Sequence, residues 1–576
     1  MKSRNDFILI FFVVQYFGMR KKWKLKKSIN KKIKGANLHP VIEQLFLNKN
    51  IETPQEIEEF LEPKYEKLHD PFLFEDMHRV VERVKRAIKN NEIIGIFGDH
   101  DADGVSSATI LSEGLEKLGL NVDVYIPDKL TEGHGINKKA IDEFVETGVT
   151  LMFSVDCGTS NIKEVAYANE KNIDVIITDH HHAPDSLPEA LAIINPQLKR
   201  CKYPFKELSG TAVAFKVVQA LFEKLKPDES QQLKWLLDVV SVGTIADCMP
   251  LLGENRIFAK YGLLVLSKTR REGYRQMFKV SNINNCNISA LTVAYQIAPR
   301  INAAGRMSHA KHAFELMRAN DSIQAFECAE FIEEQNIERR KITQKLTREI
   351  DNIVKKDHLN KKMILIAGDY PLGIIGIVAG QIANKYKKPV GIFSKLENEL
   401  RGSFRSIENL HIVKVLDKCS GYLERYGGHE QAAGAIIKKE NFDVFCKKAQ
   451  EKIVDLISGS ECNECVFADF KISFSEIDMN FVEELEKFEP FGEQNEEPVF
   501  LIESIYVREI RTIGKNDAHL RLVFESDGKI LSAIAFGKGK WSEKVSVGDK
   551  VDVLAHVQKN EWNGNVSVQL NVIDIR

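Results

Sequence analysis

Four short apolar segments near residues 90–180 constrain the fold of this chain more than any other feature. Their hydrophobic residues run continuously instead of alternating with polar ones: Ile93–Phe97, Val122–Ile126, Leu151–Val155 and Ile173–Thr178. Continuous apolar strands are typical of parallel sheets that are covered on both faces. Between the first two segments, residues 108–118 carry apolar side chains at helical spacing. The sequence therefore predicts a doubly wound α/β domain.

The remaining pattern predicts a chain of several domains, as expected for 576 residues. We expect helices at 212–226 and 231–247, a charge-rich connecting helix within 316–357, and a second α/β domain at 358–458. From residue 466, β-like runs with turn residues between them predict a small β-barrel. The runs are 499–502, 505–511, 520–524, 530–536, 551–557 and 566–572. The predicted division is a basic segment at 1–36, a first domain at 37–315, the helix, the second domain, and a barrel domain at 459–576.

Composition excludes two classes of protein. Hydrophobic content of 44% and charged content of 28% argue against wholesale disorder and against a polytopic membrane protein. The formal net charge of -2 hides a split, because residues 1–36 carry +10 and the remainder carries -12. Any nucleic-acid site beyond residue 36 must therefore be a local basic patch or a cleft charged by metal ions.

The amino-terminal segment and the cysteines indicate a cytoplasmic protein. Phe7–Phe17 is apolar but shorter than the roughly 20 residues that span a bilayer, and no A-x-A-like cleavage site follows it. We expect Met19 to be the translation start, with residues 1–18 upstream of it. The nine scattered cysteines suit a reducing compartment. Cys462 and Cys465 form a lone C-x-x-C, for which zinc and redox roles stay open, although incidental linker cysteines are the preferred interpretation.

The segment Gly98-Asp99-His100-Asp101-Ala102-Asp103-Gly104 is rich in acids. Its D-x-D-x-D-G pattern resembles a calcium-binding EF-hand loop. An EF-hand requires Glu at the twelfth position, which is Ile110 here, and a preceding helix, whereas this loop follows a predicted strand. The EF-hand hypothesis is therefore rejected.

Further acids follow the later strands. The carboxyl ends of parallel strands meet at one edge of a sheet, where ligands bind. One strand-end Asp is usually a helix cap, but several together repel one another unless cations neutralise them. Carboxylate and imidazole ligands suit Mn²⁺ or Mg²⁺, and two such ions about 4 Å apart can hold the reacting oxygens of a phosphoryl displacement, with a bound hydroxide as the nucleophile. The residues expected to converge are Asp101, Asp103, Asp156, Asp179 and His180, with Asp247 from Gly243–Asp247.

These motifs, in this order, resemble those of the DHH phosphoesterase superfamily. That superfamily includes pyrophosphatases, small-oligonucleotide and cyclic-dinucleotide phosphodiesterases, and the RecJ family. The resemblance implies that Asp101 and Asp156 hold one cation, while Asp103, Asp156, His180 and Asp247 hold the other. It further implies that His181 orients the scissile phosphate, and that Asp99 and Asp179 support the site.

Other segments resemble phosphate-binding motifs of the same proteins. Pro299–Arg306 is similar to a RecJ signature, and residues 401–406 and 427–434 look like the DHHA1 domain. An arginine side chain can donate two parallel hydrogen bonds to a phosphate group, and small residues allow backbone N–H groups to surround one. Read alone, these segments could be a helix end or flexible hairpins, and Gly373, Gly376 and Gly380 favour helix packing. The implied phosphate contacts are Lys129, Arg300, Asn302, Arg306, Ser403, Arg405, Gly428 and His429.

The carboxyl-terminal third resembles the OB-fold of the RecJ family, beginning at Phe488–Gly492. Such barrels bind single strands by stacking bases on aromatic side chains beside basic residues. Core packing remains the alternative for each aromatic residue taken singly. The candidate stacking residues are Phe491, Trp541 and Trp562, and the candidate basic residues are Arg521, Lys538 and Lys540.

The resemblance implies a 5′-to-3′ exonuclease that degrades single-stranded DNA to 5′-mononucleotides in repair and recombination. It also implies a cytoplasmic monomer that works with single-strand-binding protein and a RecQ-type helicase, without a membrane. Two alternatives stay open: a phosphodiesterase for short oligoribonucleotides or cyclic dinucleotides, and a non-catalytic replication scaffold. The chain departs from the family pattern at His100, where Tyr or another residue is usual, and at His134, where Tyr is common. It also departs at Lys129, where Arg is frequent, and at Glu496, where Pro is usual.

Overall fold

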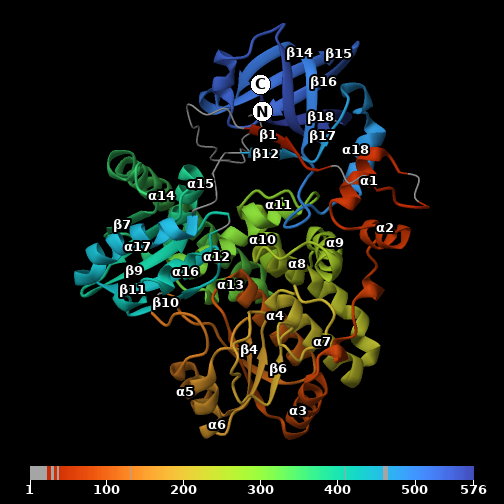
Figure 1. Ribbon diagram of the computed structural model, residues 1–576. Helices are drawn as coiled ribbons and strands as arrows, with labels where there is room; N and C mark the ends of the chain where they lie inside the picture. Colours follow the sequence, from red (N-terminus) through yellow and green to blue (C-terminus); the bar gives the residue numbers. More distant parts are fainter. Residues whose placement is uncertain are drawn as a thin grey trace. The chain divides into compact units, whose positions relative to one another are not determined.

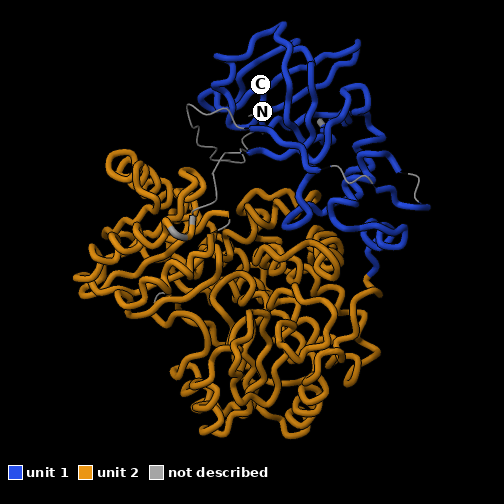
Figure 2. Tube along the Cα trace, viewed as in Figure 1, with its two compact units in different colours: residues 1–64, 462–576 blue, residues 65–461 orange. Residues whose placement is uncertain are grey.

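The computed structural model describes residues 22–27, 31–35, 38–129, 131–408, 410–457, 465–562 and 564–576. They form two compact units (Figure 2). Residues up to 64 and from 462 onward make up the first unit, and residues 65–461 the second. The expected start at Met19 and one member of the C-x-x-C pair, Cys462, lie outside the described residues.

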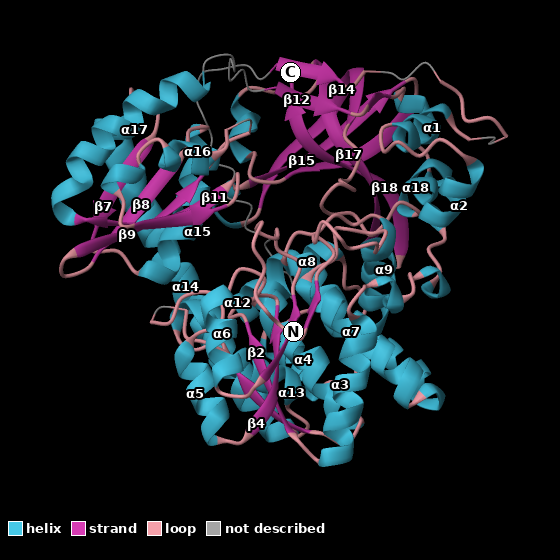
Figure 3. Cartoon of the chain, turned by 60° about the horizontal axis from the view of Figure 1, so that its bottom comes forward, coloured by secondary structure: helices cyan, strands magenta, loops and turns pink. Residues whose placement is uncertain are grey.

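The second unit contains the predicted parallel sheet (Figures 1 and 3). Its strand order is β3-β2-β4-β5-β6, and all neighbouring pairs are parallel. The strands are β2 (Ile93–Gly98), β3 (Asn121–Tyr125), β4 (Val149–Val155), β5 (Asp174–Thr178) and β6 (Ala192–Ile194). The predicted α/β fold is confirmed, with one short strand, β6, that the sequence did not reveal.

Helices cover both faces of this sheet, which explains its continuous apolar strands. Ile94 and Ile96 belong to one core with residues of α3, α4 and α7, whereas Phe97 belongs to another with residues of α5 and α6. Alternate residues of one strand are therefore buried on opposite faces. The helices are α3 (Met77–Asn90), α4 (Ala102–Lys117), α5 (Lys138–Glu146), α6 (Ile162–Glu170) and α7 (Gly210–Leu225).

A mainly helical region follows the first sheet. It comprises α8 (Leu237–Ala246), α9 (Gly253–Ser267), α10 (Glu272–Val280), α11 (Ala290–Thr292), α12 (Ala298–Met307), α13 (Lys311–Arg318) and α14 (Ser322–Ile353). The prediction of one helix at 231–247 was wrong at its start, because residues 227–236 form a 3-10 helix. No helix among the described residues is long and apolar enough to cross a membrane.

The connecting helix differs from the expected spacer. It begins at Ser322, after the separate helix α13, because Asp321 caps it by accepting hydrogen bonds from the N–H groups of Ile323 and Gln324. Along its length α14 contacts α10, α12, α13 and α15 (Leu372–Tyr386). It is thus packed between the helical region and the next sheet.

The second sheet of this unit is mixed, in the order β10-β11-β9-β8-β7. Only β7 and β8 are parallel, joined through α15, and the other neighbours are antiparallel. Two more helices, α16 (Ile412–Asp417) and α17 (Phe442–Ile457), complete it. Its strands are β7 (Ile364–Gly368), β8 (Val390–Lys395), β9 (Glu399–Arg405), β10 (Arg425–Gly428) and β11 (Ala432–Lys438).

The first unit contains a closed barrel in the order β14-β15-β16-β18-β17, completed by pairing of β17 with β14. The runs expected at 499–502 and 505–511 are one strand, since β14 bends at register shifts after Ile502 and Val507 without ending. The barrel strands are β14 (Phe500–Ile513), β15 (His519–Ser526), β16 (Lys529–Ala535), β17 (Lys550–Trp562) and β18 (Asn565–Ile575), with β13 (Phe470–Lys471) beside β14.

The amino-terminal segment belongs to the barrel unit, which differs from the division expected at residue 37. Strand β1 (Lys22–Leu25) pairs in parallel with β12 (Cys465–Ala468). Helices α1 (Pro40–Leu47) and α2 (Pro54–Leu61) contribute Phe46 and Phe60, whose rings lie 4.7 and 5.5 Å from that of Phe488. Phe488 precedes the barrel, where α18 (Met479–Glu486) also lies.

A buried ion pair fastens the segment near residue 69 to α7 and α9. The Lys216 ammonium lies 2.7 Å from Glu254 and also donates to the carbonyl of His69. Glu254 accepts hydrogen bonds from the Tyr203 hydroxyl and from the His69 N–H. Both charged side chains are almost fully buried.

We expect Glu254→Ala to lower the free energy of unfolding by about 3–5 kcal/mol, because it leaves Lys216 buried without a counter-charge. Urea unfolding followed by circular dichroism measures this loss. The control is Glu66→Ala, which removes a solvent-exposed partner of Lys234 and should change stability little. Equal effects of the two substitutions would contradict the assignment.

Candidate metal centre

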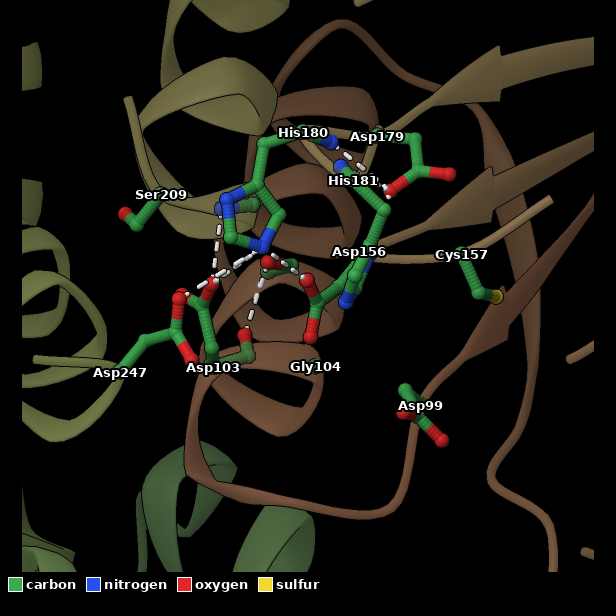
Figure 4. A network of polar contacts seen from close by, with 12 residues as sticks. Asp99, Asp103, Gly104, Asp156, Cys157, Asp179, His180, His181, Ser209 and Asp247 are labelled. Carbon is green, nitrogen blue, oxygen red and sulfur yellow. Dashed lines mark hydrogen bonds and ion pairs between the residues drawn. The ribbon is translucent and has the colours of Figure 1, made fainter. Parts of the chain in front are cut away.

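The predicted acids lie at the carboxyl edge of the parallel sheet. Asp99 follows β2, Asp156 follows β4, and Asp179 with His180 follows β5. Because these strands are parallel, their ends meet (Figure 4). The end of α8 adds Asp247 to the same place.

The imidazole of His180 lies among three carboxylates (Figure 4). Its Nε2 is 3.1 Å from Asp156 Oδ1, 3.6 Å from Asp247 Oδ2 and 3.8 Å from Asp103 Oδ2. Asp156 also belongs to a second cluster, with Asp99 and Asp101, whose ligand atoms all lie within 4.8 Å of one another. Asp156 therefore links the His180 cluster to the Asp101 cluster.

Backbone N–H groups hold two of these acids rigidly. Asp103 accepts hydrogen bonds from the N–H groups of Gly210 and Thr211, at 2.7 and 3.0 Å, at the amino terminus of α7. A helix amino terminus favours negative charge, so this contact stabilises the buried carboxylate. Asp101 caps α4 by accepting from the N–H groups of Asp103 and Gly104.

Two glycines allow the close approach of these acids. A Cβ on Gly210 would lie 2.5 Å from Asp156 Oδ1, and one on Gly243 would lie 2.7 Å from Asp103 Oδ1. Gly243 belongs to the motif that ends at Asp247. A larger residue at this position would clash with Asp103, which explains the glycine in that motif. Sequence reasoning missed Gly210 and Thr211, although Ser209 before them is a typical helix cap.

The buried carboxylates destabilise one another without a cation. Burial, and then the charges of Asp103, Asp101 and Asp247, raises the pKa of Asp156 well above its usual range. Burial, together with the charges of Asp103 and Asp101, raises the pKa of Asp247 to about 8. Burial lowers the pKa of His180, which favours the neutral imidazole that binds metals.

The geometry of Asp156 fits a cation. Its Oδ1 is buried and accepts no hydrogen bond. The nearby His180 Nε2 and this oxygen are then two lone-pair donors about as far apart as neighbouring ligands of one ion. Mixed carboxylate and imidazole donors suit Mn²⁺ and Mg²⁺ better than structural zinc.

Asp179 makes hydrogen bonds that position the two histidines. Its Oδ1 accepts from the N–H groups of His180 and His181 and lies 2.8 Å from His181 Nδ1, while Oδ2 accepts from the Thr159 N–H. Burial opposes ionisation of Asp179, but these hydrogen bonds outweigh it and lower its pKa. Burial likewise opposes the charged form of His181, yet Asp179 raises the pKa of His181 to about 9.

Three basic side chains gather beside the acids, from the loop after β3, from α12 and from β9. Burial, and then the charges of Arg306 and Arg405, lowers the pKa of Lys129 to about 8, while Asp101 and Asp99 oppose this. Burial also lowers the pKa of Arg306 and Arg405. Cations held so close together, with acids beside them, form a site that suits a phosphate group.

The second sheet contributes Ser403 and Arg405. Both lie on the same face of β9, where Arg405 Nη1 donates to Ser403 Oγ at 3.2 Å. Helix α15 packs there through Gly376, since a Cβ at this position would be 2.9 Å from Ser403 Oγ. Gly373 packs in the same way against the Arg306 carbonyl, as expected for helix packing.

His429 extends this group, with its ring 6.2 Å from that of His181. Gly427 and Gly428, where the sequence predicts a backbone nest, lie in the edge strand β10. Both glycines pair with β11, and the His429 N–H donates to the Ala432 carbonyl. Because β10 is the edge strand of its sheet, only alternate N–H groups point toward β11, so the phosphate contact predicted for Gly428 stays a prediction.

Two residues of the 299–306 segment differ in their contacts. Arg300 is buried, pairs with Glu333 of α14 and donates to the Gln296 carbonyl one turn before it in the chain. The Arg300 guanidinium thus joins α12 to α14. Asn302 accepts a hydrogen bond from the Ala102 N–H at 3.0 Å and so braces the loop of Asp101.

The barrel's candidate residues lie in different environments. Phe491 and Trp541 are half-buried, and the Lys538 ammonium lies 4.8 Å from the Trp541 ring centre. Arg521 and Lys540 are exposed, and Arg521 faces Arg511 directly across β14 and β15. The side chain of Trp562 lies outside the described residues.

Comparisons with known proteins agree with this arrangement. Family models match the DHH family, N-terminal domain at residues 93–244, the DHHA1 domain at 360–455 and the RecJ OB domain at 468–574. A single-stranded-DNA-specific exonuclease RecJ of Bacillus subtilis is 34% identical over 560 residues, which cover 96% of this chain and 70% of the relative. The chain belongs to the RecJ family. The Haemophilus influenzae RecJ is 31% identical and is covered over 96% of its length.

Solved RecJ structures share the fold. The RecJ of Thermus thermophilus in complex with Mn²⁺ matches 96% of this chain and 79% of that chain, with 26% identity and a TM-score of 0.81. A RecJ exonuclease bound to manganese matches 67% of this chain and 97% of that chain, with 29% identity and a TM-score of 0.59. The predicted dependence on Mn²⁺ or Mg²⁺ agrees with these metal-bound structures and with the acid clusters described above.

We expect Asp156→Asn to reduce stabilisation by Mn²⁺ strongly. In EDTA the variant should unfold at the same or a higher temperature than the wild type, because it lacks one buried charge among like charges. Mn²⁺ at about 100 times its Kd should stabilise the wild type by about 2.7 kcal/mol and the variant far less. Thermal unfolding with and without Mn²⁺ measures both effects. The control Asp185→Asn, an exposed loop carboxylate, should keep the full Mn²⁺ response, and an unchanged response in Asp156→Asn would exclude this centre.

Proposed function

We propose that this chain is a two-cation exonuclease that degrades single-stranded DNA from its 5′ end to 5′-mononucleotides. The observation that carries the proposal is the joint burial, in one cluster, of acids and a histidine suited to divalent cations. It occurs in a RecJ family chain that also has an OB domain. A non-catalytic scaffold would not need these acids, which destabilise one another when no cation is bound.

The two linked clusters support a pair of cations. Asp101 and Asp156 would hold one, and Asp103, Asp156, His180 and Asp247 the other, so that Asp156 bridges them. Such a pair supplies Lewis-acid polarisation of a phosphodiester and lowers the pKa of water. The helix amino terminus behind Asp103 and the hydrogen bonds around Asp179 keep these side chains in place.

The basic side chains opposite the acids would hold the DNA backbone. Lys129, Arg306 and Arg405 suit the phosphate at or next to the scissile bond, with Ser403 and His429 beside them. A charged His181, fixed by Asp179, would orient that phosphate and stabilise its growing negative charge. We assign Arg300 no phosphate contact, because Glu333 neutralises it.

The barrel would bind single-stranded DNA through residues other than those of the metal centre. Exposed Arg521 and Arg511 lie directly opposite each other, an arrangement that repels unless an anion lies between them. A backbone phosphate on this face of β14 and β15, with bases stacked on Trp541 or Phe491, fits the sequence-tolerant binding of OB-folds.

We place this activity in the cytoplasm, in DNA repair and recombination, with single-strand-binding protein and a RecQ-type helicase supplying single strands. The compartment is supported by the cysteine usage, since the exposed Cys286 is a free thiol in the described part of the chain. The partners follow from the need of a single-strand enzyme for unwound DNA.

Single strands and blunt duplexes labelled at the 5′ or the 3′ end test the proposal, with Mn²⁺, Mg²⁺ or EDTA. We expect 5′-labelled single strands to release labelled mononucleotide first, duplexes to resist, and EDTA or Asp103→Ala to abolish cleavage. Asp185→Ala is the control for a lost carboxylate. Equal digestion of blunt duplex, activity confined to very short RNA or cyclic dinucleotides, or full activity of Asp103→Ala would each refute it.

Arg405→Ala should lower kcat/KM for single-stranded DNA about 10–100-fold, the effect of losing one charge-assisted hydrogen bond to phosphate. The matched control is Arg401→Ala, on the same strand and the same face, where the guanidinium pairs with Glu399. Steady-state kinetics should show little change for the control. Similar losses of kcat/KM in both variants would mean that substitutions in β9 lower activity by disturbing the fold and not by removing a phosphate contact.

A further inference from the structure

Two histidines meet beside Asp99 at the edge of the metal centre, although neither belongs to the inferred cation ligands. His100 follows Asp99 directly, and His134 comes from the loop after β3. Their ring centres are 4.6 Å apart. The structure brings together two histidines that are 34 positions apart in the chain.

The ligand atoms of this trio converge on one point. His100 Nδ1 lies 2.7 Å from Asp99 Oδ1, and His134 Nδ1 lies 3.6 Å from Asp99 Oδ2. All three donors lie within 4.8 Å of one another. These spacings match those of neighbouring ligands around one metal ion.

His100 gives a second, independent sign of a ligand. Its side chain is 2% exposed, and its Nδ1 lies 2.7 Å from Asp99 Oδ1 without a hydrogen bond of good geometry. A buried polar atom without a partner is costly in a folded protein. A lone pair on Nδ1 directed at a cation removes that cost.

The loop that carries His134 is built to hold it there. Gly133 and Gly135 flank it with positive φ values of 80° and 81°, which form a tight turn. The Ile136 N–H donates to Asn161 Oδ1 on one side, and on the other Glu132 accepts from the Tyr125 hydroxyl. The imidazole thus extends from a turn that is fastened at both ends.

We infer that Asp99, His100 and His134 form a further cation site, separate from the catalytic pair, that takes a borderline transition ion such as Zn²⁺. Two imidazoles and one carboxylate are the donors that such ions prefer, whereas Mg²⁺ and Ca²⁺ prefer oxygen. The His134 side chain is 70% exposed, so water can complete the coordination and the ion can enter from solvent.

Occupancy of this site would join the loop after β3 to the end of β2. That loop also carries Lys129, so the ion would fix the position of a basic side chain that lies beside the acids. The bound cation would also neutralise Asp99, which lies within 4.8 Å of Asp101 and Asp156. The site is therefore a positioning device beside the reaction centre and takes no part in bond cleavage.

Zinc binding by the full-length chain tests this inference in a background that lacks the catalytic pair. The double variant Asp156→Asn/His180→Gln removes two inferred catalytic ligands, and equilibrium dialysis against Zn²⁺ followed by elemental analysis gives the stoichiometry. We expect one equivalent of Zn²⁺ in this background. Adding His134→Ala should weaken its binding more than about tenfold, since even residues outside the ligand shell have effects of that size.

The matched control adds His78→Ala, an exposed histidine of α3, to the same background and should leave zinc binding unchanged. Circular dichroism in EDTA verifies that the variants fold alike. No zinc in the double variant, or equal affinity with and without His134, overturns the inference. Neither result depends on nuclease activity. The experiment with labelled DNA substrates tests the proposed function separately.

Discussion

The mutual repulsion of carboxylates buried at one edge of a parallel sheet is the constraint on which the rest of this structure depends. Asp103 and Asp156 are almost completely buried, with Asp247 and Asp101 beside them. Like charges in a medium of low dielectric constant are tolerated only where cations or strong hydrogen bonds neutralise them. Backbone N–H groups donate hydrogen bonds to Asp103. One oxygen of Asp156 accepts no hydrogen bond from the protein and is left for a cation.

The residues of the site are therefore of two kinds: those whose charged groups are paired with groups of the protein, and those that keep an atom for a cation or a phosphate. Asp179 uses its carboxylate to accept from backbone N–H groups and to contact His181, so it positions other groups. Asp156 keeps an oxygen without a donor, so it is suited to a cation. The same criterion distinguishes Arg306, which lies beside acids and other cations, from Arg300, which is neutralised by Glu333. Residues close together in the sequence thus differ in chemistry because their neighbours differ.

Much of the fold and of the acid cluster could be predicted from local pattern. Continuous apolar strands followed by acids place those acids at one sheet edge, because parallel strands end on the same side. The prediction failed where long-range packing decides. Strand β14 continues through two register shifts that resemble a turn in the sequence, and residues 40–61 belong with the barrel because Phe46 and Phe60 pack on Phe488. No local signal records contacts between such distant parts of the chain.

By itself the sequence determined the α/β class, the order of the domains and the identity of the acids and histidine at the strand ends. These follow from periodicity and chain direction, which are local properties. Only the tertiary structure decided which charged groups are neutralised, that the glycine pair in β10 forms a strand, and that His100 and His134 meet at Asp99. Burial and the meeting of distant segments decide the state of a side chain, and neither can be read from the residues beside it in the chain.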